Sequence, residues 1–284
     1  MLTLFPLSML VLAELTNRAL AFFNTSTCTA NQTAFARTAF DDAFNYFHTM
    51  YLSERTGMGI GKLSYEDIPV LRTRYFGHLS PNQSAFVAAI QTTKSFSETA
   101  NLTISCVRPG VDFRRAMACS SLLGSGIFAT TDAGSQSIGL CPAFFSLPQK
   151  STILFGSRAR QYDAAEWHTA ATSVILSLVS LANPQVRQIT PKINSCGLFA
   201  DLRTPLSISS SRNSTDLQSC VQRLAATEPD LAIHYAYSYA LYTSAIALGA
   251  EFGMPRPVSL RGSGLDRDVR RRPMKNRIGT GRLG

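Results

Sequence analysis

The segment Ala170-Ala-Thr-Ser-Val-Ile-Leu-Ser-Leu-Val-Ser-Leu-Ala182 lies in the middle of a chain of 284 residues. It contains no charged side chain, and beyond Ser173 its only polar groups are the hydroxyls of Ser177 and Ser180. A helix that is apolar on all sides is normally buried in a protein core. We therefore expect a buried helix here, starting near residue 164.

A second apolar segment, residues 231–250, has no charged side chain. Its length could suggest a membrane span, but it contains His234, four Tyr, two Ser and one Thr. We therefore expect a helix over about 229–250 that packs against residues 170–182 and does not span a membrane.

Helical patterns also occur near the start of the chain. Residues 30–52 carry apolar side chains at helical spacing, and a glycine-containing stretch at 57–61 interrupts the pattern. Ser80 followed by Pro81 is typical of an N-cap and a first helical residue, which predicts a second helix through about Ser95. The spaced apolar residues of the first helix are Ala36, Phe40, Ala43, Phe44, Phe47 and Tyr51.

Residues 102–156 do not have the helical spacing of the preceding segments. They contain short β-prone runs separated by Gly, Ser and Pro, which is typical of a small sheet. Because helices, strands and helices are grouped along the chain rather than alternating, we expect an α+β fold that is mainly helical. The expected strands lie near residues 102–107, 127–131, 138–140 and 152–155.

The first 21 residues predict a secretory signal peptide. Leu2 to Leu12 is an uncharged apolar run, too short to span a bilayer as a helix, and Ala19-Leu20-Ala21 fits a small-x-small cleavage site. A cleavage site at residues 11–13 and a buried N-terminal helix are the alternatives. Residues 22–254 then form the expected folded domain.

Residues 255–284 hold most of the net charge. They contain eight Arg and one Lys against two Asp, which gives +7 of the +9 carried by the whole chain. The segment has no apolar period, so we expect a basic disordered tail. Such a tail could bind nucleic acid, but secretion argues against that partner.

Two features support an extracellular location. The chain has five Asn-x-Ser/Thr sequons, which accept glycans in secreted proteins. An even number of cysteines without a Cys-x-x-Cys pair favours three disulfides over a zinc site, with fifteen pairings open. The sequons begin at Asn24, Asn31, Asn82, Asn101 and Asn213, and the cysteines are Cys28, Cys106, Cys119, Cys141, Cys196 and Cys220.

Candidate catalytic residues are few. The chain has four His, and no two of them have the i, i+4 spacing that holds a metal on one helical face. The stretch Ser135-Gln-Ser-Ile-Gly139 resembles a nucleophile elbow but lacks the first Gly. His168 follows the only Trp, and we interpret it as a structural residue at the start of a helix.

Three motifs nevertheless follow one another in a characteristic order. A Cys, aromatic and Leu-Pro segment, Ile138-Gly-Leu-Cys-Pro-Ala-Phe-Phe-Ser-Leu-Pro148, precedes the apolar 170–182 helix, and the segment Tyr235-Ala-Tyr-Ser-Tyr-Ala240 follows in the last helix. This order resembles the deuterolysin family, fungal secreted neutral zinc endopeptidases of the aspzincin type, which close with Asn-Ala-Asp-Ser-Tyr-Ala. The resemblance covers roughly residues 28–250 and implies a zincin-like fold.

The resemblance also implies a disulfide pattern. It pairs Cys28 with Cys106 in a long loop and Cys119 with Cys141 in a short one. Cys196 and Cys220 then pair by exclusion, which departs from the family.

The family's zinc motif is lost in this chain. Thr172 and Ser173 fit the residues before it, but His-Glu-x-x-His is replaced by Leu176-Ser177-Leu178-Val179-Ser180. Leu and Ser are poor replacements for His ligands, and Ser cannot act as general base for a metal-bound water. The nearest remnant of the family's Gly-Thr-x-x-Asp loop ends at Asp201.

We therefore predict a secreted homologue of these peptidases that has no catalytic residues and no cofactor. We expect it to act as a monomer by binding an unknown protein or cell-wall partner. One alternative is an active metalloendopeptidase that binds zinc through the weaker candidates His168, Asp201 and His234. The other is an effector-like or cell-surface glycoprotein unrelated to proteolysis, in which residues 170–182 are an ordinary core helix.

Overall fold

The computed structural model describes residues 22–23, 27–80, 82–108, 110–119, 128–156, 168–188 and 214–254. The fold is α+β and mainly helical, as the grouping of the patterns predicted. Its elements are β1 (Phe22–Phe23), α2 (Ala30–Thr56), α3 (Asp67–Phe76), α4 (Gln83–Thr99), β2 (Thr103–Cys106), α5 (Phe113–Cys119), β3 (Ala129–Asp132), β4 (Ser137–Leu140), the 3-10 helix η1 (Pro142–Ser146), α6 (Lys150–Gly156), α7 (Ala170–Ala182), α8 (Pro184–Gln188), α9 (Ser214–Thr227), α10 (Pro229–Ile233) and α11 (Ala236–Phe252).

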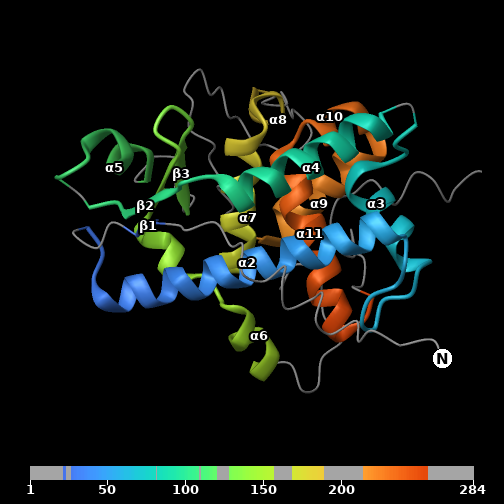
Figure 1. Ribbon diagram of the computed structural model, residues 1–284, viewed down its shortest axis with the longest axis horizontal. Coiled ribbons are helices and arrows are strands. Elements are labelled where there is room, and N and C mark those ends of the chain that lie inside the picture. Colours follow the sequence, from blue (N-terminus) through green and yellow to red (C-terminus); the bar gives the residue numbers. More distant parts are fainter. Residues whose placement is uncertain are drawn as a thin grey trace, which may run out of the picture.

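Helix α7 is the centre of the fold. It packs against α2, α4, α11 and β3 (Figure 1), and 12 of its 13 residues are buried, so it has no solvent-facing side. The expected packing of the two apolar helices, α7 and α11, is confirmed. Helix α7 begins at Ala170, later than residue 164, because Thr169 is its N-cap.

An aromatic cluster holds α11 against α3 and α4. The ring centroid of Phe76 lies 4.8 Å from those of Phe86 and Tyr239 and 5.5 Å from that of Tyr242. Edge-to-face pairs of this kind each contribute roughly 0.5–1.5 kcal/mol beyond the burial of their surface. The cluster therefore fixes α11 along the core, where it also covers α7.

Helix α2 confirms the helical spacing seen at residues 30–52. A capping box starts it, in which the Thr29 hydroxyl accepts from the Gln32 N–H at 3.2 Å and the Gln32 side chain accepts from the Thr29 N–H at 3.0 Å. Gly57 ends it in the left-handed region, with φ of 62°, a conformation that costs Gly little. The predicted glycine break is therefore the C-cap of this helix.

The start of α4 differs from the prediction. Ser80 is not its N-cap, since the helix begins at Gln83 with Asn82 in the N-cap position and runs on to Thr99. The Asn82 side chain does not cap the helix. Its amide NH2 group donates to the carboxylate of Asp230 and so ties α4 to α10.

The sheet has four strands in the order β1-β2-β4-β3. Strand β2 lies parallel to β1 and β4, whereas β3 and β4 form an antiparallel hairpin. Three of the four predicted β runs form strands. The prediction of a fourth strand at residues 152–155 is wrong, because these residues lie in helix α6. The first residue of α6, Lys150, forms an ion pair with Glu251 of α11. Tertiary contacts here outweigh a short β-prone run.

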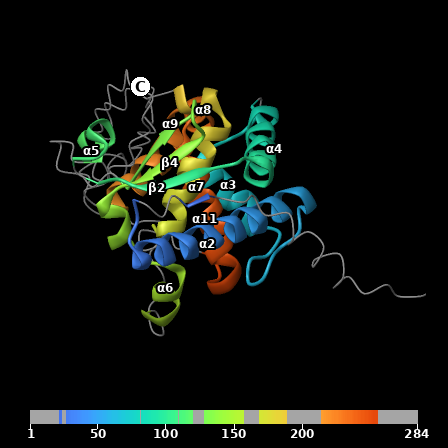
Figure 2. The ribbon, with the colours of Figure 1, turned by 60° about the vertical axis from the view of Figure 1, so that its left-hand side comes forward.

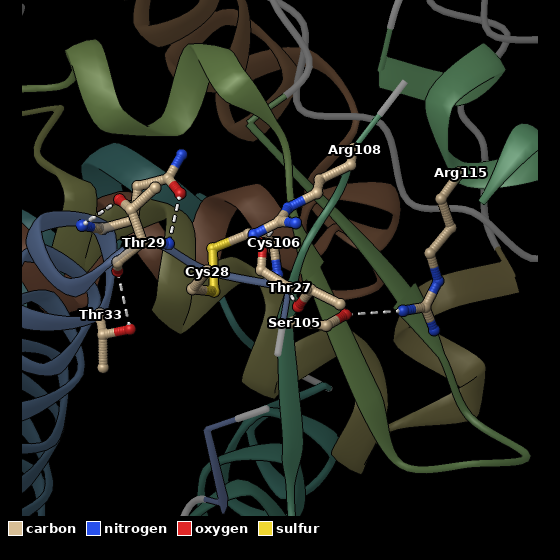
Figure 3. Close-up of a disulfide and its surroundings, with 9 residues drawn as sticks. Thr27, Cys28, Thr29, Thr33, Ser105, Cys106, Arg108 and Arg115 are labelled. Atoms are coloured by element: carbon tan, nitrogen blue, oxygen red, sulfur yellow. Dashed lines mark hydrogen bonds between the residues drawn. A yellow bond between two sulfur atoms is a disulfide. The ribbon is translucent and has the colours of Figure 1, made fainter. Parts of the chain in front are cut away.

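Two disulfides brace the sheet, and both predicted pairs are confirmed. Cys28–Cys106 joins the start of α2 to the end of β2 across 78 residues (Figure 3), and Cys119–Cys141 joins α5 to the end of β4 across 22 residues. In the loop-entropy treatment the longer bridge contributes about 4 kcal/mol. The predicted Cys196–Cys220 pair lies outside the side chains that the structure describes.

The expected 229–250 helix is broken into α10 and α11. His234 ends α10, and Tyr235 adopts an extended conformation, with φ of −109° and ψ of 107°, before α11 begins. In the described part of the chain, no helix is both long enough and apolar enough to cross a membrane.

Three of the five sequons fall within the described residues. The side chains of Asn31 and Asn101 are exposed, whereas Asn82 is half-buried and hydrogen-bonded to Asp230. Asn24 and Asn213 lie outside the described residues, as do the predicted signal peptide, residues 1–21, and the basic tail, residues 255–284.

Candidate functional site

The start of α7 is held by a ladder of hydroxyl groups. Thr169 is the N-cap, and its hydroxyl and that of Thr172 each accept from the other residue's N–H at 3.2 Å. The Thr172 hydroxyl also hydrogen-bonds to Ser244 of α11 at 2.8 Å. These contacts fix α7 against α11 at the end where the resemblance places the residues before the zinc motif.

The three side chains that the sequence resemblance aligns with a zinc motif are buried. Leu176, Ser177 and Ser180 expose only 7%, 2% and 1% of their surface. The Ser177 hydroxyl donates to the carbonyl of Ser173 in its own helix at 3.1 Å, so its proton is engaged in a hydrogen bond within the helix. The Ser180 hydroxyl has no hydrogen-bond partner among the residues that the structure describes.

This environment does not fit a zinc ion. Leu176 offers no lone pair, and the two hydroxyls are neutral and weak donors to a metal. A catalytic zinc also needs an open position for water, but these side chains are packed into the core. No step of metal-assisted hydrolysis can be assigned to these residues.

His168 lies directly before the N-cap of α7 and is fully buried. One ring nitrogen, Nδ1, hydrogen-bonds to the hydroxyl of Tyr237, and Nε2 lies 3.1 Å from the hydroxyl of Ser173. The imidazole also stacks on the Tyr237 ring and packs against Phe128. Burial lowers the pKa of His168 to about 4, so the ring is neutral at physiological pH.

The contacts of His168 explain why it is a structural residue. A neutral imidazole has one N–H and one acceptor nitrogen, and here both are engaged. Residue 168 precedes the N-cap and residue 173 is the fourth of the helix, the two positions that a hydrophobic staple joins. The His168–Ser173 contact is a polar version of that staple, and it leaves no ring nitrogen for a metal.

Tyr235 and Tyr237 stand where the resemblance described above would place Asn and Asp. Burial raises the pKa of Tyr235 to about 12 and that of Tyr237 well above its usual value, so both phenols stay neutral. A buried aspartate in place of Tyr237 would need a cation or a metal as partner. Tyr237 instead hydrogen-bonds to the neutral His168, a contact that the sequence did not predict.

The other weak candidates do not join His168. His234 is half-buried at the end of α10, and Asp201 lies outside the described residues. Within the described ranges, no three His, Cys, Asp or Glu side chains are grouped so that they could hold a metal ion.

The segment resembling a nucleophile elbow is a hairpin turn. Residues 132–137 connect β3 to β4, with Gln136 in the left-handed region at φ of 46°. The Ser137 hydroxyl accepts from the Arg115 guanidinium at 2.5 Å and lies 2.7 Å from Ser135. A nucleophile elbow sits between a strand and a helix, so this turn is not one.

Sequence patterns also missed a partly buried carboxylate. Glu54 of α2 accepts two hydrogen bonds from Arg72 of α3, at 3.1 and 2.6 Å, and a third from the Tyr242 hydroxyl of α11. Because the carboxylate is fully partnered and joins three helices, we interpret it as a structural clamp rather than as an acid or base. The sequence alone shows only that Glu54 lies near the end of an amphipathic helix, which does not indicate its partners.

Comparisons with known proteins do not assign this chain to a family. No protein-family model matches the chain, and no curated protein matches it. Among solved structures, the chain is similar to a zinc peptidase from Grifola frondosa, with 12% sequence identity and a TM-score of 0.44 over 76% of this chain and 96% of that chain. We assign no activity to this chain from that similarity.

Proposed function

We propose that this chain is a secreted, disulfide-braced homologue of zinc endopeptidases whose catalytic helix has become a structural helix. It has no catalytic activity of its own and acts by binding a protein or cell-wall partner. The order of motifs along residues 138–246 supports the relationship, and the signal-like start and the sequons support secretion. The two disulfides are compatible with an oxidising compartment.

One observation carries the proposed loss of activity. Leu176, Ser177 and Ser180, which stand at the two ligand positions and the base position of the motif, are all buried against neighbouring elements. An unpaired His-Glu-His set in this environment would be costly without metal. Leu and Ser at these positions give a helix that packs without an ion.

The alternative with non-standard ligands is disfavoured by His168. Its two ring nitrogens already contact Tyr237 and Ser173, so binding a metal would break one of two buried hydrogen bonds. That loss would leave a buried polar group without a partner, at a cost of about 1–3 kcal/mol.

Proteolysis assays separate the two possibilities. The purified protein is incubated with zinc and an unfolded protein substrate, with and without a chelator, beside an active zinc endopeptidase as positive control. We expect no chelator-sensitive cleavage, since no Lewis acid or base is present at the motif.

If cleavage is seen, single substitutions of the candidate zinc ligands identify which residues bind the metal. Chelator-sensitive cleavage that disappears in His168→Ala or Asp201→Ala would replace the proposal with a peptidase that uses other ligands.

A further inference from the structure

The asparagines of the three described sequons lie in different surroundings. Asn31 is exposed in the first turn of α2, and Asn101 is exposed in the short link that leads from α4 into β2 (Figure 2). Asn82 is half-buried at the N-cap position of α4. An N-glycan is a bulky group that needs a surface position, so the three sequons are not equivalent acceptors.

The amide nitrogen of Asn82 is already in contact with a distant part of the chain. It donates to the carboxylate of Asp230, 148 residues later, and so joins the start of α4 to the first turn of α10 (Figure 1). An N-glycan would be attached to this same nitrogen atom. A sugar on Asn82 would therefore have to fit between α4 and α10, in the place of a hydrogen bond that the carboxylate charge strengthens.

Helix α10 has little freedom to move aside for a sugar. It packs against α3 and α9, and its buried Ala232 lies in a small apolar cluster with Leu224 and Ala225 of α9. The approach to α3 is close, because a Cβ at Gly77 would clash with the Ala225 carbonyl oxygen and lie 2.9 Å from the Cβ of Pro229. Separating α10 from α4 would therefore disturb the packing of α3, α9 and α10 together.

We propose that the folded protein carries N-linked glycans on Asn31 and Asn101 and none on Asn82, whose side chain serves instead as a structural link between α4 and α10. This inference rests on the proposed secretion, because N-glycans are added to chains that enter the secretory pathway. It does not depend on the lost zinc motif.

The sequons also differ in their third residue. It is Thr at the exposed sites, Thr33 and Thr103, and Ser at position 84, two residues after Asn82. The test therefore has to separate this local difference from the contact with Asp230. Ser84→Thr does so, because Ser84 is exposed and the change gives Asn82 the same kind of sequon as the other two sites.

Peptide mapping of the full chain, made in a eukaryotic host, tests the proposal. The wild type and Ser84→Thr are each expressed with and without a host signal peptide fused before Met1, and protein is collected from the medium. Glycans are removed enzymatically in heavy-oxygen water, which converts each glycosylated asparagine to a labelled aspartate. Mass spectrometry of the peptides then gives the labelled fraction at Asn31, Asn82 and Asn101 separately.

Label is expected at Asn31 and Asn101 in both proteins. At Asn82 we expect label in fewer than about a tenth of the chains, because the loss of one hydrogen bond to a charged group shifts the folding equilibrium by roughly tenfold or more. Label at Asn82 comparable to that at Asn31, in the wild type or in Ser84→Thr, would overturn the proposal. So would protein in the medium that carries no label at Asn31 and Asn101.

The host signal peptide separates this proposal from the proposed secretion. If the chain reached the medium only behind the host signal peptide, and then carried label at Asn31 and Asn101 but not at Asn82, the assignment of the glycan sites would be supported and the proposed secretion contradicted.

Discussion

Acidification tests the buried environment of His168. The pKa of this imidazole falls from 6.5 to about 4 because burial penalises the charged form. Between these two values the unfolded chain binds the proton and the folded protein does not. Stability is therefore fully present above pH 6.5, falls as the pH drops toward 4, and levels off below that.

The size of the loss follows from the shift. A difference of 2.5 pKa units at about 1.4 kcal/mol per unit corresponds to roughly 3 kcal/mol. Protonation would also place a positive charge at the N-terminus of α7, which the helix dipole disfavours. This is a large fraction of the stability of an ordinary domain.

Urea unfolding at a series of pH values between 7.5 and about 4 measures this loss. Carboxylates also titrate in this range, so the informative quantity is the difference between the wild type and His168→Gln, which can hydrogen-bond but cannot be protonated. The variant should be less stable at pH 7.5, and the difference should shrink by roughly 3 kcal/mol toward pH 4. His78→Gln, at an exposed position, should follow the wild type. If the free energies of unfolding of the wild type and His168→Gln changed in parallel with pH, the reasoning would be refuted.

Two further predictions concern polar groups of the helices. Ser180→Ala removes a buried hydroxyl that has no hydrogen-bond partner in the described part of the chain, so it should leave the thermal midpoint unchanged or raised. Ser177→Ala removes a hydrogen bond to Ser173 and should cost about 1 kcal/mol. The opposite order of the two midpoints in a thermal scan would contradict the described packing of α7. Glu54→Gln leaves the partly buried Arg72 guanidinium beside α2 without its counter-charge and should cost about 1–3 kcal/mol in urea unfolding. Glu98→Gln, which breaks the more exposed pair with Lys94, should cost less than about 1 kcal/mol. Equal losses would show that the clamp is not desolvated.

The parts of the fold that the sequence predicted are those set by local pattern. The apolar run at 170–182 could only be stable when covered on every side, and α7 is buried in that way. The spacing of Phe40, Phe47 and their neighbours predicted α2 because its periodicity spans many turns. The grouping of strands between helices then indicated the α+β arrangement.

The parts that could not be predicted depend on contacts distant in sequence. His168 and Tyr237 are 69 residues apart, and no local pattern marks that they meet. The break at Tyr235 interrupts a segment whose composition suits one continuous helix, since the aromatic contacts of α11 and the Asn82–Asp230 link of α10 fix the two pieces separately. Residues 152–155 have β-prone side chains, but the Lys150–Glu251 ion pair ties the start of α6 to α11.

The central claim is that α7 is a structural helix that needs no metal. Its most direct test is the zinc content of protein purified without chelator, dialysed against zinc and then washed, measured together with the thermal midpoint before and after a chelator is added. The account predicts much less than one zinc per chain and the same midpoint in both states. One tightly held zinc per chain, with a midpoint that falls when the chelator removes it, would contradict the account.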